Sequence, residues 1–209
     1  MKFIGNKVLK RNLVANSNQK VPLVEKIDNE KFFTVVSLFS GCGGMDLGFL
    51  GNFDFLEKHY DKTKFNIIWA NEINPVACET YRMNIGNHII EGDINNIMGT
   101  LPKYADVVIG GFPCQDISIN GKMLGIKGKR SSLYTAIVEA VKRIQPKVFV
   151  AENVGGLLLK QNEASLNKIL KDFNGLGYSI HHELYRASEY GVEVKFTLND
   201  TWRSVAKVD

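Results

Sequence analysis

The stretch that decides the fold class is Thr34-Val-Val-Ser-Leu-Phe-Ser-Gly-Cys-Gly-Gly-Met-Asp-Leu-Gly-Phe49, in which a short apolar run leads into a glycine turn and an amphipathic segment. The apolar run predicts a buried strand at 34–39, and the segment after the glycines predicts a helix at 44–50. The glycines permit positive φ angles, so a polar ligand can approach bare backbone N–H groups at the helix start. Such a loop by itself is also compatible with NAD, a flavin or no ligand.

The same alternation of strand and helix continues along the chain. Further strands are predicted near 66–71, 88–91, 105–110, 147–151 and 178–186, and further helices near 75–84, 131–144 and 162–174. This alternation predicts an α/β fold with a doubly wound, mostly parallel sheet. Folds of this kind bind ligands at the carboxyl ends of their strands, so polar residues at those ends are candidate site residues.

A cysteine follows one of these strands directly. The segment 106–119 carries a buried strand into a Gly-Gly turn that presents Cys114 between Pro113 and Gln115. A thiol at the carboxyl edge of the sheet is placed as a nucleophile, and proline stiffens the backbone before it. The alternative is a small buried side chain, which is what most single cysteines are.

Acidic residues follow three other strands. Glu72 ends the strand at 66–71, and Asp93 and Ile94 follow the next one, where they offer a carboxylate and an apolar side chain to a purine ring. Glu152 and Asn153 follow the strand at 147–151. An acid at a strand end can also cap the next helix. The strand-end acids and the thiol nevertheless converge on one edge of the predicted sheet.

With these motifs in view, the chain resembles the cytosine-C5 DNA methyltransferases over about residues 34–192. The motifs that carry the resemblance occur in the family's order and approximate spacing: the glycine loop with Phe39, then Glu72, Asp93-Ile94, Pro113-Cys114-Gln115, Arg130-Ser-Ser-Leu133, Glu152-Asn153-Val154 and the segment 187–192. The resemblance implies the Rossmann-like sheet of the S-adenosylmethionine-dependent methyltransferases.

The resemblance also implies covalent catalysis. Cytosine C5 is a poor nucleophile, and addition of a thiolate to C6 converts C5 into an enamine carbon. By resemblance Cys114 supplies the thiolate and Glu152 holds or protonates the ring N3. Pro113, Gln115 and Asn153 are implied supporting residues, and Asn153 is expected to orient the loop that carries the thiol.

The implied methyl donor is S-adenosyl-L-methionine, and no metal is expected. By resemblance Phe39 packs on the adenine, and Glu72 takes the ribose hydroxyls. The other implied cofactor residues are Gly41, Gly43 and Gly44 for the methionine part, Ile73 beside Glu72, and Asp93 and Ile94 for the adenine.

Double-stranded DNA is the implied substrate, and its target base must leave the stack to reach the thiol. A basic, glycine-rich loop follows Cys114, and its cations are the expected phosphate contacts: Lys122, Lys127, Lys129 and Arg130. A solvated basic loop is the plain alternative.

Three regions are expected along the chain. Residues 1–33 form a basic arm with seven basic and three acidic residues, residues 34–192 form the catalytic domain, and residues 193–209 form a divergent tail. The tail lacks the Pro-Gln and the two alternating arginines of the family. We therefore expect the catalytic half of a split enzyme with a complementing methyltransferase subunit, a truncated product, or a degenerate relative.

The cysteine content and the hydropathy of the sequence bear on the compartment in which the protein is expected. The three cysteines, at positions 42, 78 and 114, form no disulfide pattern, and no run approaches the roughly 18 apolar residues of a membrane span. A cytoplasmic, nucleoid-associated protein of a restriction-modification system is expected. The alternatives are a catalytically inactive module that binds cofactor or a partner, a tRNA cytosine-5 methyltransferase and a nucleotide-dependent oxidoreductase.

Overall fold

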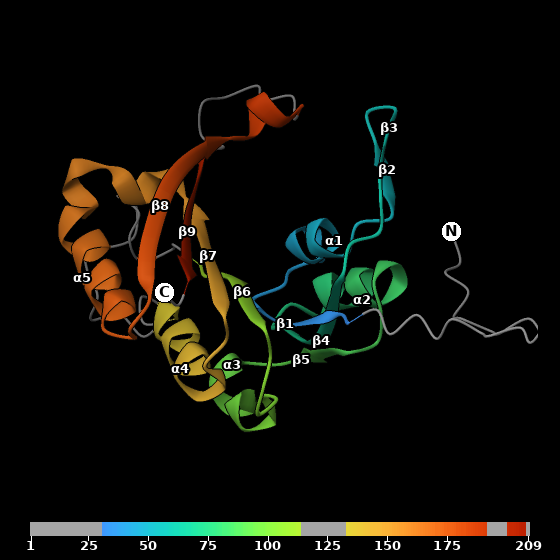
Figure 1. Ribbon diagram of the computed structural model, residues 1–209, viewed down its shortest axis with the longest axis horizontal. Helices are drawn as coiled ribbons and strands as arrows, with labels where there is room; N and C mark the ends of the chain where they lie inside the picture. The colour runs from blue at the N-terminus through green and yellow to red at the C-terminus, as the bar shows by residue number, and fades with distance from the viewer. Residues whose placement is uncertain (1–30, 114–132, 192–199, 208–209) are drawn as a thin grey trace, which may run out of the picture. The chain divides into compact units, whose positions relative to one another are not determined.

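The computed structural model describes residues 31–113 and 133–191, and the backbone of 200–207. The chain from Phe32 onward forms one compact unit around a seven-stranded sheet with the order β5-β4-β1-β6-β7-β9-β8 (Figure 1). Five strands of this sheet are parallel: β1 (Phe33–Leu38), β4 (Phe65–Glu72), β5 (Ile89–Glu91), β6 (Val107–Gly111) and β7 (Val148–Val154). The strand β9 (Asp200–Lys207) is antiparallel to both β7 and β8 (Ser179–Arg186).

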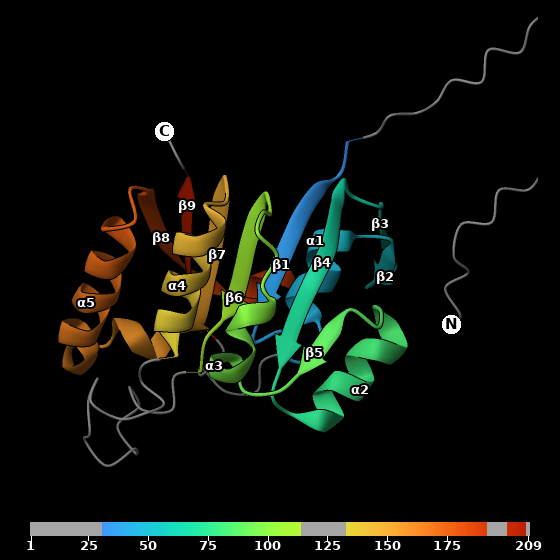
Figure 2. The same cartoon turned by 90° about the horizontal axis from the view of Figure 1, so that it is seen from below.

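Helices cover both faces of this sheet, and Figure 2 shows α4 and α5 in front of the strands with α1 behind. The α-helices are α1 (Gly44–Leu50), α2 (Pro75–Asn84), α3 (Ile94–Ile97), α4 (Tyr134–Ile144) and α5 (Glu163–Asn174). Short 3₁₀ turns span Met98–Thr100, Gly155–Leu158, Lys160–Asn162 and Ala187–Tyr190. None of the helices in the described part of the chain is long and apolar enough to cross a membrane.

Two hydrophobic clusters, one on each face, hold the layers together. Successive residues of β1 point to opposite faces, so Val35 joins the cluster that contains Tyr81 of α2, whereas Val36 joins the cluster that contains Ile137 of α4. Both valines are fully buried. Burial on both faces explains why this strand is an almost unbroken apolar run.

The predicted doubly wound, mostly parallel fold is confirmed, and α1 and α2 have the predicted bounds. The strand predicted at 147–151 is longer, because β7 continues to Val154 and its last residues pair with Gly111 of β6 and with β9. Glu152 and Asn153 therefore lie at the carboxyl end of the strand, as predicted, although the strand ends three residues later than expected. The antiparallel hairpin of β2 (Phe53–Phe55) and β3 (Lys58–Tyr60) was not predicted.

The structure also places residues 200–207 in the sheet, between β7 and β8, although we expected 193–209 to form a tail. Residues 192–199 lie outside the described residues, as do residues 1–30 of the basic arm.

The amino edge of the sheet is tied together by one buried carboxylate, Asp106. Its Oδ2 accepts hydrogen bonds from the backbone N–H of Thr34 at 2.9 Å and from the Thr34 hydroxyl at 3.0 Å. Its Oδ1 accepts from the Tyr104 hydroxyl and from Lys147 Nζ, both at 2.7 Å. Burial by itself raises the pKa of Asp106, but these hydrogen bonds outweigh it and hold the pKa well below its ordinary value.

We expect Asp106→Asn to lower the free energy of unfolding by about 2–3 kcal/mol, because charge-assisted hydrogen bonds from three residues are weakened together. A carboxylate with a lowered pKa stabilises the folded state above the pKa of the unfolded chain, so the effect is full above about pH 5 and shrinks as the pH falls. Urea unfolding at pH 7 and at pH 3 measures the loss of stability and its dependence on pH. Lys147→Met removes a partner that is 56% exposed and should cost clearly less than Asp106→Asn. Equal costs for the two substitutions would contradict this assignment.

Candidate functional site

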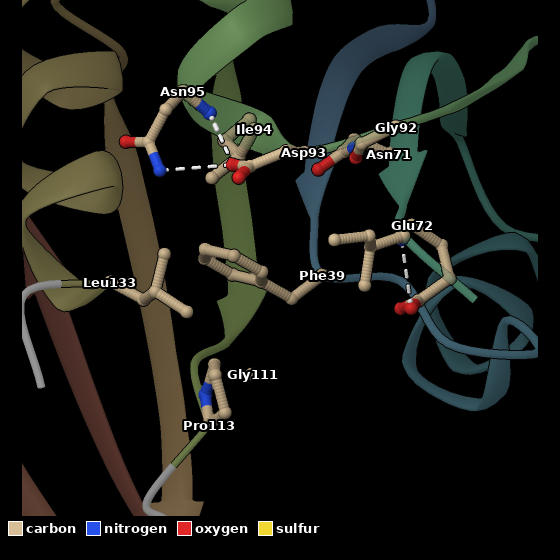
Figure 3. Close-up of a pocket in the computed structure, with 11 residues that line it drawn as sticks. Phe39, Asn71, Glu72, Gly92, Asp93, Ile94, Asn95, Gly111, Pro113 and Leu133 are labelled. Carbon is tan, nitrogen blue, oxygen red and sulfur yellow. Dashed lines mark hydrogen bonds between the residues drawn. The ribbon is translucent and has the colours of Figure 1, made fainter. Parts of the chain in front are cut away.

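A cavity of about 690 Å³ opens at the carboxyl edge of the sheet, where β1, β4 and β6 end. Its lining combines apolar and acidic residues with backbone: Phe39, Asn71, Glu72, Ile73, Gly92, Asp93, Ile94, Asn95, Gly111, Pro113 and Leu133. Figure 3 shows the Phe39 ring in the middle of this set, between Leu133 and Glu72, with Asp93 and Ile94 on one side and Gly111 and Pro113 on the other. Residues from five separate segments of the chain thus line one cavity.

A second cavity, of about 190 Å³, adjoins the first. Phe39 and Gly111 line both cavities, and Glu152 lines the second. A Cβ atom on Gly111 would stand 2.9 Å from Glu152 Oε2, so this position admits the carboxylate only because it has no side chain. The two cavities connect Glu72 at the end of β4 and Asp93 after β5 with Glu152 of β7.

The glycine loop forms one wall of this region. Phe39 has a φ angle of 55°, in the left-handed region, and its strained backbone turns the chain into the loop. Gly43 has a φ angle of 92°, and a Cβ atom there would lie 2.0 Å from Ile85 Cδ1. The missing side chain of Gly43 therefore serves close packing against the end of α2. Gly41 and Gly44 have open space where a Cβ would stand.

Glu72 joins this loop to the start of α2. Its Oε2 accepts a hydrogen bond from the backbone N–H of Gly41 at 3.0 Å, and its Oε1 accepts from the N–H groups of Ile73 and Asn74 at 2.9 and 2.8 Å. A carboxylate has about four acceptor positions, so Oε2 can still accept from a ligand hydroxyl. Glu72 therefore holds the glycine loop close to the start of α2 and is also a candidate hydrogen-bond acceptor for a ligand.

The turn after β5 positions a second carboxylate. Asp93 Oδ1 caps α3 by accepting from the backbone N–H of Asn95 at 2.9 Å and from the Asn95 side chain at 2.9 Å. The buried side chain of Asn71 donates to the carbonyls of Ile90 and Gly92, at 3.1 and 2.9 Å, and so fixes this turn against β4. Both of these hydrogen bonds go to Oδ1, so Oδ2 is a candidate acceptor for a ligand.

Asn153 holds the backbone that leads to the predicted nucleophile. It is 2% exposed, and its Nδ2 donates to the carbonyl of Phe112 at 2.8 Å. Its Oδ1 accepts from the backbone N–H of Val154 at 2.9 Å. The peptide just before Pro113 is thus anchored to β7 across the sheet edge.

Residues 33–194 match the sequence family of the C-5 cytosine-specific DNA methylases. This chain belongs to that family. It is 41% identical to the Type II methyltransferase M.NgoFVII of Neisseria gonorrhoeae over 160 residues, which cover 76% of this chain and 40% of the relative. It is 35% identical to the Type II methyltransferase M.BsuRI of Bacillus subtilis over 199 residues, which cover 86% of this chain and 45% of the relative. The chain thus spans less than half the length of these relatives.

The fold is also that of solved methyltransferase structures. The S. pombe Dnmt2 methyltransferase superposes with a TM-score of 0.57 at 21% identity, over 84% of this chain and 49% of that one. At this identity the likeness concerns the fold alone.

In this DNA methylase chain, most of the predicted site residues within the described ranges meet at the two cavities. Ile94 is 2% exposed and forms part of the lining, whereas Ile73 is 64% exposed at the edge. Gly41, Gly43 and Gly44 line neither cavity. Six predicted residues lie outside the described residues: Cys114, Gln115, Lys122, Lys127, Lys129 and Arg130.

Five residues that line the larger cavity were not predicted as site residues: Asn71, Gly92, Asn95, Gly111 and Leu133. Asn71 precedes the predicted acid Glu72, and Leu133 ends the family-like segment before α4. Asn95 lies two residues after Asp93, a spacing typical of an Asx cap, and could have been found from that pattern. Asn71 gave no such signal, because its partners, Ile90 in β5 and Gly92 just after it, are 19 and 21 positions away.

Proposed function

We propose that this chain is the cofactor-binding and catalytic part of a Type II DNA (cytosine-5-)-methyltransferase, with the catalytic and cofactor-binding residues within 34–192. The reaction is transfer of a methyl group from S-adenosylmethionine to cytosine C5 in duplex DNA. The observation that carries the proposal is the pair of adjoining cavities, in which Phe39 and Gly111 connect Glu72 and Asp93 with Glu152.

The larger cavity fits S-adenosylmethionine in size and in chemistry. Its volume of about 690 Å³ lies in the range of small-molecule sites. Phe39 and Ile94 offer apolar contact to an adenine ring, Glu72 retains an acceptor position for ribose hydroxyls, and Asp93 can accept from an amino group. When bound, S-adenosylmethionine supplies an electrophilic methyl group.

The chain's own residues prepare the cytosine. In this proposal the Cys114 thiolate adds to C6 and forms the covalent bond that makes C5 nucleophilic, and Glu152 holds or supplies the proton at N3. After methylation the C5 proton is lost and the thiol is expelled. Support comes from the anchored peptide before Pro113, because Asn153 fixes the Phe112 carbonyl two residues before the thiol.

DNA binding in this proposal uses cations that follow the thiol: Lys122, Lys127, Lys129 and Arg130. Their phosphate contacts carry charge and no sequence information. The proposal therefore assigns target recognition to a part of the enzyme other than these residues, since the matched part covers only 40% of the relative from N. gonorrhoeae.

Cofactor binding by the full chain tests the proposed function. We expect calorimetry to detect binding of S-adenosylmethionine and Glu72→Ala to weaken it about 10- to 100-fold, because a charge-assisted hydrogen bond is lost and the Gly41 loop is released. Glu91→Ala is the matched control, since Glu91 ends the neighbouring strand β5, pairs with Arg82 and does not line the cavity. A folded sample that binds no cofactor at millimolar concentration would refute the proposal.

A further inference from the structure

Two carboxylates of the described residues are buried in the protein, and their surroundings differ. Asp106, 4% exposed at the amino edge of the sheet, has Lys147 as an ionic partner. Asp46, in the first turn of α1 near the carboxyl edge, is 0% exposed. None of the ion pairs within the described part of the chain includes Asp46.

The partners of Asp46 are neutral hydroxyl groups. Asp46 Oδ2 accepts from the Ser37 hydroxyl at 2.9 Å, and Oδ1 accepts from the Tyr81 hydroxyl at 2.8 Å. Tyr81 Oη lies 2.9 Å from His88 Nε2, and the Ser40 hydroxyl donates to Ser37 Oγ at 2.9 Å. Burial lowers the pKa of His88, which favours the neutral imidazole. Dipoles thus converge on Asp46 from both sides, but no described side chain brings a full positive charge.

A buried carboxylate without a cation is costly, because hydroxyl groups replace only part of its hydration. Burial raises the pKa of Asp46, and the hydrogen bonds from Tyr81 and Ser37 oppose this only in part. A ligand cation beside Asp46 would stabilise its charged carboxylate. The smaller cavity offers the place for one, since Asp46, Ser37 and Ser40 line it together with Phe39 and Glu152.

We propose that Asp46 is a binding residue that provides the counter-charge for a cationic methyl donor, and that it makes the site prefer a sulfonium ligand to the neutral thioether left after methyl transfer. The inference rests on the proposed function, which brings S-adenosylmethionine to the adjoining cavity. A charge held in a low-dielectric interior acts on a neighbouring cation far more strongly than the same charge would in water. The preference assists release of S-adenosylhomocysteine, whose sulfur carries no charge.

The test compares the dissociation constants of S-adenosylmethionine and S-adenosylhomocysteine for the full chain at pH 7. Asp46→Asn keeps the shape of the side chain and removes its charge, so we expect it to weaken S-adenosylmethionine at least tenfold more than S-adenosylhomocysteine. Asp106→Asn is the matched control, because it removes the other buried carboxylate and should leave the ratio of the two constants unchanged.

Each outcome of these binding measurements either supports or overturns the proposed role of Asp46. Equal weakening of both ligands by Asp46→Asn would show that Asp46 only supports the fold, and would overturn the inference. If Asp46→Asn does not fold in a thermal unfolding scan, the unsubstituted chain decides, since equal or tighter binding of S-adenosylhomocysteine contradicts a site built for the cation. If the folded, unsubstituted chain binds neither ligand, the proposed function itself fails. Binding of both ligands with an unchanged ratio defeats only the role of Asp46.

Discussion

Replacing Cys114 by serine is expected to abolish the covalent complex with duplex DNA that contains 5-fluorocytosine. The fluorine at C5 cannot leave as a proton does, so an enzyme that adds a thiolate to C6 stays attached to the base after methyl transfer. A serine hydroxyl at the same place is far less acidic and less nucleophilic than the thiol, and loss of a nucleophile commonly lowers the rate by 10³-fold or more.

The measurement is a denaturing gel of the full chain with S-adenosylmethionine and the fluorinated DNA, together with a chain that carries the remaining part of a family member. The other two cysteines provide matched controls, because Cys42 is exposed in the glycine loop and Cys78 is buried in α2. We expect Cys42→Ser and Cys78→Ser to retain the complex. A complex that persists in Cys114→Ser would place the nucleophile elsewhere.

The second large effect is expected at Glu152. Glu152→Gln keeps the size of the side chain but removes the group that holds or donates a proton at N3, so the methylation rate should fall about 10²- to 10⁴-fold. Single-turnover transfer of tritiated methyl groups to duplex DNA, with the same complementing chain, measures this rate. Binding of S-adenosylmethionine should fall much less than the methylation rate, because the proposed adenine and ribose contacts lie in the larger cavity, which Glu152 does not line.

The position of the Glu152 carboxylate can be tested without changing Glu152. Gly111→Ala would place a Cβ atom 2.9 Å from Oε2 and should displace the carboxylate, so we expect a lower methylation rate. Gly99→Ala is the matched control, because a Cβ atom there meets nothing within 4 Å. A Gly111→Ala protein with the original rate, or a Glu152→Gln protein with it, would contradict the proposed role of this carboxylate.

The fold was predictable from the sequence where local patterns are strong. The helix α2 begins at Pro75 after Asn74, whose side chain accepts from the N–H groups of Val76 and Ala77, and both signals are visible in the sequence. The strand β1 was equally clear, because it is buried on both faces. The length of β7 and the existence of β9 were not predictable, because both depend on pairing between residues about 50 positions apart, such as Glu152 with Arg203.

The sequence by itself determined which residue types stand at the strand ends, since the glycine loop, Glu72, Asp93 and Pro113 all follow predicted strands. Only the tertiary structure decided what each of them contacts. The Glu72 carboxylate meets the N–H group of Gly41, 31 positions away, and the Asn153 amide meets the carbonyl of Phe112, 41 positions away. The physical reason is that a hydrogen bond of this kind depends on the register of neighbouring strands. Local sequence patterns report the face on which a side chain lies, but not the atom that it meets across the sheet.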